Sequence, residues 1–212
     1  MKENEIIVAQ KLLQINAIKL NPAKPFTWAS GLKSPIYCDN RKTLSYPEVR
    51  NLIRNSFVKI VREKYSETEA IAGVATGAIA HGVLVAEVLN LPFVYIRSTA
   101  KSHGMENLIE GDYLPGQKFT VIEDLVSTGG SSLKAVEALR NVGCNVLGMI
   151  AVFSYGFSHA VNNFLIAKCK LETLCNYEIL IETAIKSGYI SEKELDTLKE
   201  WRKAPEKWGL EI

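Results

Sequence analysis

The fold is decided by the stretch Phe119-Thr-Val-Ile-Glu-Asp-Leu-Val-Ser-Thr-Gly-Gly-Ser-Ser132. Its first four residues form an apolar run typical of a buried strand, and apolar residues recur at helical spacing from Leu133 to Leu139. The small residues between them therefore occupy a turn from a strand into a helix. Such a turn directs backbone N–H groups and the positive end of a helix dipole at an anion.

Two adjacent acids, Glu123 and Asp124, come directly after the predicted strand. The loop that follows offers hydroxyl donors, and its glycines, Gly129 and Gly130, allow a positive φ and close approach of a ligand. A phosphate fits the loop, whereas the acids would hold sugar hydroxyls or a cation that travels with a polyphosphate. We expect a sugar-phosphate site at the carboxyl edge of a sheet. The alternative for the glycines and serines is a simple turn and helix cap.

Strand-like and helical segments alternate along the chain. The apolar patterns predict strands at 35–38, 70–74, 93–96, 119–122 and 146–153, and helices at 6–15, from Pro47 onward, at 82–89 and between 177 and 208. This alternation predicts an α/β fold with a mostly parallel sheet flanked by helices.

The composition is that of a globular enzyme. The chain has 212 residues, of which 47% are apolar and 23% charged, so it can bury a full core as one domain. A net charge of +2 without a basic cluster argues against a nucleic-acid or membrane partner. The four cysteines show no C-x-x-C spacing and no signal-like segment opens the chain, so we expect a soluble cytoplasmic protein.

Three stretches carry a resemblance to a known family. The segment Val121-Ile-Glu-Asp-Leu-Val-Ser-Thr-Gly-Gly-Ser-Ser132 resembles the signature with which type I phosphoribosyltransferases bind 5-phospho-α-D-ribose 1-diphosphate (PRPP). Two others, Phe26-Thr-Trp-Ala-Ser-Gly-Leu-Lys-Ser-Pro-Ile-Tyr-Cys-Asp-Asn-Arg41 and Arg97-Ser-Thr-Ala-Lys-Ser-His-Gly104, together resemble orotate phosphoribosyltransferases. The similarity runs from about residue 10 to residue 155.

The resemblance implies a type I phosphoribosyltransferase fold in a single domain, 1–212. It divides into an N-terminal hood with the base-binding segment at 1–45, an α/β core at 46–160 and a C-terminal helical part at 161–212. The implied reaction moves the 5-phosphoribosyl group of PRPP to orotate, giving orotidine 5′-monophosphate and diphosphate in pyrimidine synthesis. The implied cofactor is Mg²⁺ carried by PRPP, with Asp124 as a possible ligand. The family also implies a homodimer whose subunits share their active sites.

The residues expected to bind PRPP lie in two segments. They are Arg97, Lys101, His103, Glu123, Asp124, Leu125, Val126, Ser127, Thr128, Gly129, Gly130 and Ser131. We expect Lys101, His103 and Asp124 to be catalytic, because opposite charges develop on the ribose ring and on the departing diphosphate. The segment from Arg97 to Gly111 lacks an apolar period, and long patternless loops are often lids. A solvated, slightly basic loop is the alternative.

Orotate is a flat anion that needs an aromatic face and a donor for its carboxylate. Tyr37 is the expected face, Lys33 or Arg41 the expected charge, and Ser127 the hydroxyl that the resemblance turns toward orotate. Ordinary core packing is the alternative for at least one of Phe26, Trp28 and Tyr37.

The chain departs from the best-known bacterial pattern at several positions. Ala29 and Ser98 replace expected lysines, Thr76-Gly77 stands where a Tyr-Lys pair is often found, and Tyr155 stands where an arginine can contact orotate. Two other functions therefore stay open. A purine or uracil phosphoribosyltransferase would share the PRPP signature, and a non-catalytic regulator of this fold would sense PRPP without transferring it.

Overall fold

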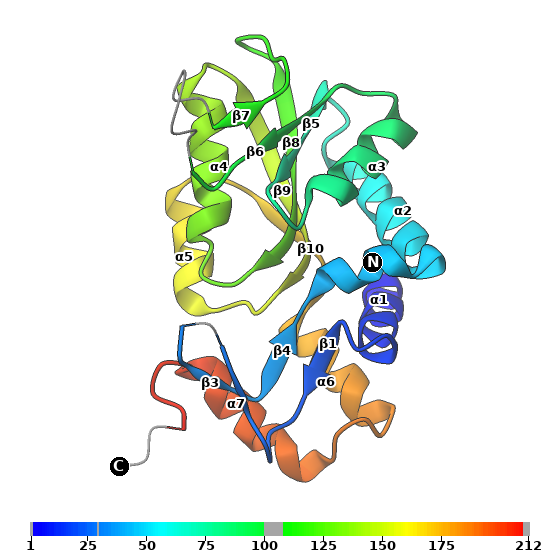
Figure 1. Cartoon of the computed structure of the whole chain (residues 1–212), viewed down its shortest axis with the longest axis vertical. Coiled ribbons are helices and arrows are strands. Elements are labelled where there is room, and N and C mark those ends of the chain that lie inside the picture. Colours follow the sequence, from blue (N-terminus) through cyan, green and yellow to red (C-terminus); the bar gives the residue numbers. More distant parts are fainter. Residues whose placement is uncertain (1, 29, 100–107, 210–212) are drawn as a thin grey trace.

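The centre of the molecule is a six-stranded sheet with helices on both faces (Figure 1). The computed structural model describes residues 2–28, 30–99 and 108–209. The strand order is β10-β9-β8-β5-β6-β7, and all neighbours are parallel except β6 and β7. The strands are β5 (Ala70–Val74), β6 (Phe93–Ile96), β7 (Ile109–Glu110), β8 (Lys118–Val126), β9 (Asn145–Ser154) and β10 (Leu171–Asn176).

The order in which the chain adds strands to the sheet reverses between the parallel neighbours β5 and β8. The chain passes from β5 to β6 on one side of this boundary, and from β8 through β9 to β10 on the other. Open α/β sheets bind ligands in the crevice outside the carboxyl ends of the strands at such a point. The acid pair and the loop after β5 both lie there.

Two hydrophobic layers cover the sheet. Helices α4 (Gly130–Asn141) and α5 (Ser158–Ile166) pack on one face, and α2 (Pro47–Lys64) and α3 (Ile79–Leu89) pack on the other (Figure 1). Pro47 occupies the first turn of α2, where its missing N–H is not needed for a helical hydrogen bond. All five residues of β5 are buried, which explains its continuous apolar sequence.

The N-terminal part forms a small hood over the carboxyl ends of the strands (Figure 1). It contains α1 (Lys2–Gln14), the antiparallel pairs β1 (Ile18–Leu20) with β4 (Ile36–Cys38) and β2 (Phe26–Thr27) with β3 (Lys33–Ser34), and the 3-10 helix η1 (Asn40–Ser45). The C-terminal helices α6 (Tyr177–Lys186) and α7 (Leu195–Lys203), with the short η2 (Glu192–Glu194), lie beside it.

The predicted strands at 70–74 and 93–96 are confirmed to the residue. Two predictions are wrong in detail. The strand predicted to end at Ile122 continues through the acids to Val126, because Leu125 and Val126 pair with β9. The part 161–212, expected to be helical, also contains β10, whose half-buried Leu171, Glu172 and Thr173 form no apolar run because it is an edge strand with one neighbour.

Within the described ranges, no helix combines the length and the apolar character that a membrane crossing requires.

Candidate active site

Glu123 is held inside the protein, beneath the edge of the sheet. Its side chain is buried, and one carboxyl oxygen accepts a hydrogen bond of 2.8 Å from the Ser132 hydroxyl of α4. The other accepts one of 2.9 Å from the main-chain N–H of Asp124. Burial, followed by the negative charge of Asp124, raises the pKa of the Glu123 carboxyl above its usual range. The carboxyl of Glu123 therefore fixes the end of β8 to the start of α4.

Asp124 is half-buried and lies near the end of β8, beside the loop after β5. A Cβ added to Gly77, in the loop after β5, would overlap the Asp124 carboxylate. This close approach explains the glycine at a position where a Tyr-Lys pair was expected. Asp124 therefore presents its carboxylate at the boundary between β5 and β8, where the fold binds ligands.

The loop from Ser127 to Gly129 leads into the first turn of α4, which contains Gly130 and Ser131. Gly129 has a φ of +81° and caps the helix, whereas Gly130, expected to share this freedom, is already helical. Thr128 and Ser131 are exposed, so their hydroxyls are accessible to a ligand. The first N–H groups of α4 and these hydroxyls form an arrangement suited to a phosphate.

A cavity of about 270 Å³ lies between the hood and this loop. Its lining residues come from three separate segments of the chain: Thr27, Trp28, Tyr37, Cys38, Leu125, Ser127 and Tyr155. Tyr37 and Ser127, both predicted to contact the base, face the same space, and the side chain of Tyr37 is 40% exposed. We call this space the base cavity.

Lys33 is the predicted cation that the fold brings toward the base cavity. Its ammonium donates a hydrogen bond of 2.9 Å to the hydroxyl of Thr27, which lines the cavity. Arg41 instead pairs with Asp39 at 2.7 Å, and this guanidinium lowers the pKa of the Asp39 carboxyl. Of the two cations that the sequence offered for an anionic base, Lys33 is therefore better placed.

Arg97 lines a second cavity of about 440 Å³ on the same edge of the sheet, beside the ends of β5 and β6. Its guanidinium pairs with the carboxylate of Glu110 at 3.2 Å. Ser98, which replaces an expected lysine, lines the same cavity. Lys101 and His103, the two predicted catalytic residues of this loop, lie outside the described residues, as does Ala29.

Three buried polar residues beneath the site were missed by sequence reasoning. The amide of Asn40 donates a hydrogen bond of 2.6 Å to the main-chain carbonyl of Asp124, across 84 residues of sequence. The hydroxyl of Thr43 bonds to the Asn40 carbonyl and lies 3.2 Å from Nε2 of His81. Burial lowers the pKa of the His81 imidazole to about 4. Only tertiary structure brings Asn40 to Asp124 and Thr43 to His81, so neither spacing nor composition could have identified these contacts.

Tyr155, which stands where an arginine was expected, is almost fully buried among aromatic rings. Its ring packs on Trp28 with centroids 5.5 Å apart. The pair forms an aromatic wall of the base cavity. Trp28 thus has both roles considered for it, since it packs against the core and also lines the cavity.

Among the described residues, no group of three or more His, Cys, Asp or Glu side chains could hold a metal ion. Asp124 offers a single carboxylate at the ligand edge. Mg²⁺ is commonly held by one or two carboxylates together with substrate phosphates, so this donor set fits a magnesium ion that arrives with a polyphosphate.

Comparison with known proteins identifies the family and supports the fold. A family model described as the phosphoribosyl transferase domain matches residues 43–185. The orotate phosphoribosyltransferase of Phocaeicola vulgatus is 62% identical, covering 98% of each chain. A solved orotate phosphoribosyltransferase from Aeropyrum pernix superposes with a TM-score of 0.75 at 24% identity, covering 87% of this chain and 99% of that one. One from Mycobacterium tuberculosis, in complex with PRPP, has a TM-score of 0.64 at 21% identity, covering 84% and 98%.

A match over most of the chain at this identity is decisive. The chain belongs to the phosphoribosyltransferase family and, within it, to the orotate phosphoribosyltransferases.

Proposed function

We propose that this protein transfers the 5-phosphoribosyl group of PRPP to a ring nitrogen of orotate, giving orotidine 5′-monophosphate and diphosphate. The observation that carries the proposal is the base cavity, because Leu125 and Ser127 of the PRPP signature line it together with Tyr37 of the hood. A donor loop and an aromatic wall therefore meet in one space, as a two-substrate transfer requires.

The donor is bound through the loop at the start of α4. The 5′-phosphate accepts hydrogen bonds from the N–H groups and hydroxyls of Thr128 to Ser131. Asp124 accepts from a ribose hydroxyl and stabilises the positive charge that develops on the ribose ring as the bond to diphosphate breaks. The Glu123 carboxyl already accepts two hydrogen bonds from the protein. Its main contribution is therefore to keep Asp124 and the start of α4 in fixed positions.

The base lies against Tyr37 in the base cavity. Orotate carries one carboxylate, and the ammonium of Lys33, anchored beside the cavity by Thr27, supplies the matching charge. The hydroxyl of Ser127 donates to the base from the donor side. These contacts orient the attacking nitrogen toward C1 of the ribose.

Negative charge on the departing diphosphate is stabilised by Arg97, Lys101 and His103. Lys101 is the main electrostatic residue, and His103 is a donor or acid to the diphosphate. Arg97 must exchange its contact with Glu110 for the substrate. Mg²⁺ held by the PRPP phosphates, with Asp124 as a ligand, would supply further neutralisation of the leaving group.

The active protein is a cytoplasmic homodimer in this proposal. The family resemblance implies that Lys101 and His103 act in the active site of the neighbouring subunit. Closure of such a loop would exclude water that could otherwise hydrolyse PRPP. The product feeds the synthesis of UMP.

The test measures diphosphate release from PRPP and Mg²⁺ with orotate, uracil, adenine or hypoxanthine as the acceptor. Release with orotate at least about 10³-fold faster than with the other bases supports the assignment, because a site built for a charged group rejects analogues that lack it. Faster release with a purine or with uracil would reassign the base, and no release with any base would indicate a sensor of PRPP.

A further inference from the structure

The wall of the base cavity is supported from behind by the C-terminal helix. Trp201 of α7 is completely buried. Its ring stands edge-on to Trp28, with centroids 5.8 Å apart and planes at 84°, and to Tyr155, at 5.7 Å and 76°. Both of these residues line the base cavity. Edge-to-face packing fixes ring orientation as well as distance, so Trp201 sets the position of both wall residues.

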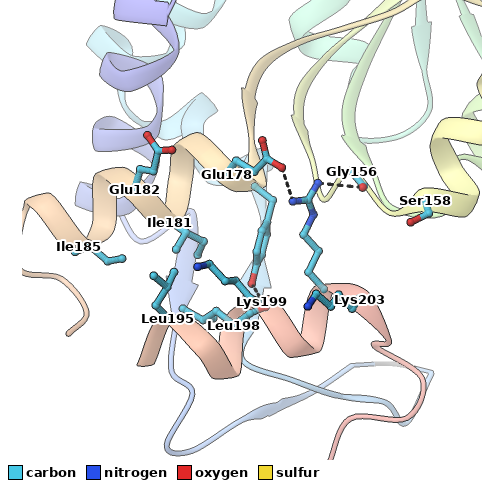
Figure 2. Close-up of a pocket in the computed structure, with 12 residues that line it drawn as sticks. Gly156, Ser158, Glu178, Ile181, Glu182, Ile185, Leu195, Leu198, Lys199 and Lys203 are labelled. Atoms are coloured by element: carbon cyan, nitrogen blue, oxygen red, sulfur yellow. Dashed lines mark hydrogen bonds and ion pairs between the residues drawn. The ribbon is translucent and has the colours of Figure 1, made fainter. Parts of the chain in front are cut away.

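The next residue of α7 fixes the main chain of the same wall. The Arg202 guanidinium donates hydrogen bonds to the carbonyls of Tyr155, at 3.1 Å, and Gly156, at 3.2 Å. A third nitrogen–oxygen contact, of 2.8 Å, pairs it with Glu178 of α6. Two of these contacts, those with Glu178 and with the Gly156 carbonyl, are the dashed lines next to these two labels in Figure 2. Because a guanidinium is a rigid fork, it holds the two carbonyls at a fixed separation.

Arg202 also explains the glycine beside it. Gly156 has a φ of +63°, and an added Cβ would lie 2.9 Å from a guanidinium nitrogen of Arg202. The chain therefore turns sharply after Tyr155 at a residue that leaves room for the arginine. Trp201 and Arg202 act on Tyr155 from two directions, one through its ring and one through its carbonyl.

Helix α7 lies outside residues 43–185, the part that matches the family model. The PRPP-binding loop belongs to β8 and α4, inside that part. The ring contacts and hydrogen bonds by which Trp201 and Arg202 support the site are made to Trp28, Tyr155 and Gly156, on its base side.

We propose that Trp201 and Arg202 are positioning residues that set the affinity for the acceptor base by fixing Trp28 and Tyr155. This inference rests on the proposed function, because the base cavity must be the orotate site. The expected consequence is that the KM for orotate and the KM for PRPP respond differently. Loss of either support raises the KM for orotate and leaves the KM for PRPP unchanged.

The first variant to measure is Arg202→Gln in the full-length chain, with both KM values and kcat. The KM for orotate should rise about 10-fold, since small misplacements of a binding wall have large effects, while the KM for PRPP stays within about twofold. Arg202→Lys keeps the charge without the fork and should give a smaller rise. Lys199→Gln, an exposed change on the same helix, is the control and should match the wild type.

The second pair is Trp201→Phe and Trp201→Leu. Phe keeps an aromatic edge, so the orotate KM of Trp201→Phe should stay within about threefold of the wild-type value. Leu has no ring, so the orotate KM of Trp201→Leu should rise about 10-fold or more. Phe119→Leu removes a buried ring at the opposite end of β8 and is the control for destabilisation, with the melting temperature of both variants measured. If Trp201→Leu does not fold, the Arg202 variants and Trp201→Phe decide the question.

Equal rises in both KM values, or the same orotate effect in Phe119→Leu, would overturn the inference, because either pattern indicates general destabilisation. So would an unchanged orotate KM in Arg202→Gln. Failure of the wild-type protein to use orotate at all is a different result, which removes the proposed function together with the inference.

Discussion

Asp124 is fixed from two sides. Its carboxylate faces Gly77 at a separation that leaves no room for a Cβ, and its carbonyl accepts a hydrogen bond from Asn40. The sequence predicted the importance of Asp124, because an acid pair followed by a glycine loop is a local pattern. It predicted neither neighbour, because Gly77 and Asn40 lie 47 and 84 residues away and reach Asp124 only through the fold.

Gly77→Ala should displace the Asp124 carboxylate, because the new methyl group would overlap it. We expect kcat/KM for PRPP to fall about 10²-fold, the scale of an angstrom-sized misplacement in an active site. Steady-state kinetics checks this, with circular dichroism as the control for folding. Unchanged kcat/KM in a folded variant would show that Asp124 does not need its present position.

His81 should make the protein less stable in acid. Its folded pKa of about 4 is below the unfolded value of 6.5, so the unfolded chain takes up a proton first as the pH falls. Its contribution is complete above pH 6.5 and declines toward pH 4. At pH 4.5 we expect a loss of about 2–3 kcal/mol in the free energy of unfolding.

The measurement is urea unfolding of the wild type and His81→Gln at pH 7 and pH 4.5. The variant should lose about 2–3 kcal/mol less than the wild type over this interval. Other titrating groups are common to both proteins and cancel in the comparison. Equal losses in the two proteins would mean that His81 takes up its proton equally in the folded and unfolded states.

At the scale of elements, the agreement between sequence and structure depends on how much of each element is buried. The fully buried β5 has an unbroken apolar sequence, and its predicted bounds are confirmed. The acids of β8 end the apolar run at Ile122, although the backbone pairing continues through them to Val126. The edge strand β10 has no continuous apolar run because only one side of it is paired, so it was not predicted.

Asn40 joins η1 of the hood to the end of β8, and its side chain is buried. Asn40→Leu keeps the approximate size but leaves the Asp124 carbonyl without this donor. We expect a loss of about 1–3 kcal/mol in stability, the usual cost of an unsatisfied buried group. We also expect kcat/KM to fall for both substrates, because Asn40 connects the base half to the donor half.

The matched control is Ser56→Ala, which removes a buried hydroxyl hydrogen-bonded to Asn4 and to the Leu52 carbonyl, away from the site. Its stability should fall as well, with kinetics near those of the wild type. Thermal unfolding and initial rates compare the two variants. Similar kinetic losses in both would reduce the role of Asn40 to general stability.

At the scale of the whole molecule, the sheet order brings together what the sequence could only place in separate segments. The signature loop, the hood and the loop after β5 meet at the boundary between β5 and β8. The remaining predicted residues, Lys101 and His103, lie outside the described residues. Their expected place in a neighbouring subunit could not follow from the residues of one chain, since an interface between subunits leaves no spacing pattern.

A mixture of two inactive variants tests the shared site. Lys101→Ala removes the loop cation and Asp124→Asn the donor acid, so neither homodimer should turn over at more than about 1% of the wild-type rate. In a two-fold dimer whose loops cross, each mixed dimer contains one intact site. A refolded 1:1 mixture should regain about a quarter of the wild-type specific activity, because half of the dimers are mixed. No recovery would place the loop in its own subunit.

The near-ultraviolet absorbance of orotate, followed in the presence of PRPP and Mg²⁺, tests whether the base cavity and the donor loop form one transferase site. We predict that absorbance falls steadily with the wild-type protein, stays constant when PRPP is omitted, and falls about 10²-fold more slowly or not at all with Asp124→Asn. Constant absorbance with the folded wild-type protein and both substrates, or an undiminished rate in Asp124→Asn, would contradict a shared transferase site.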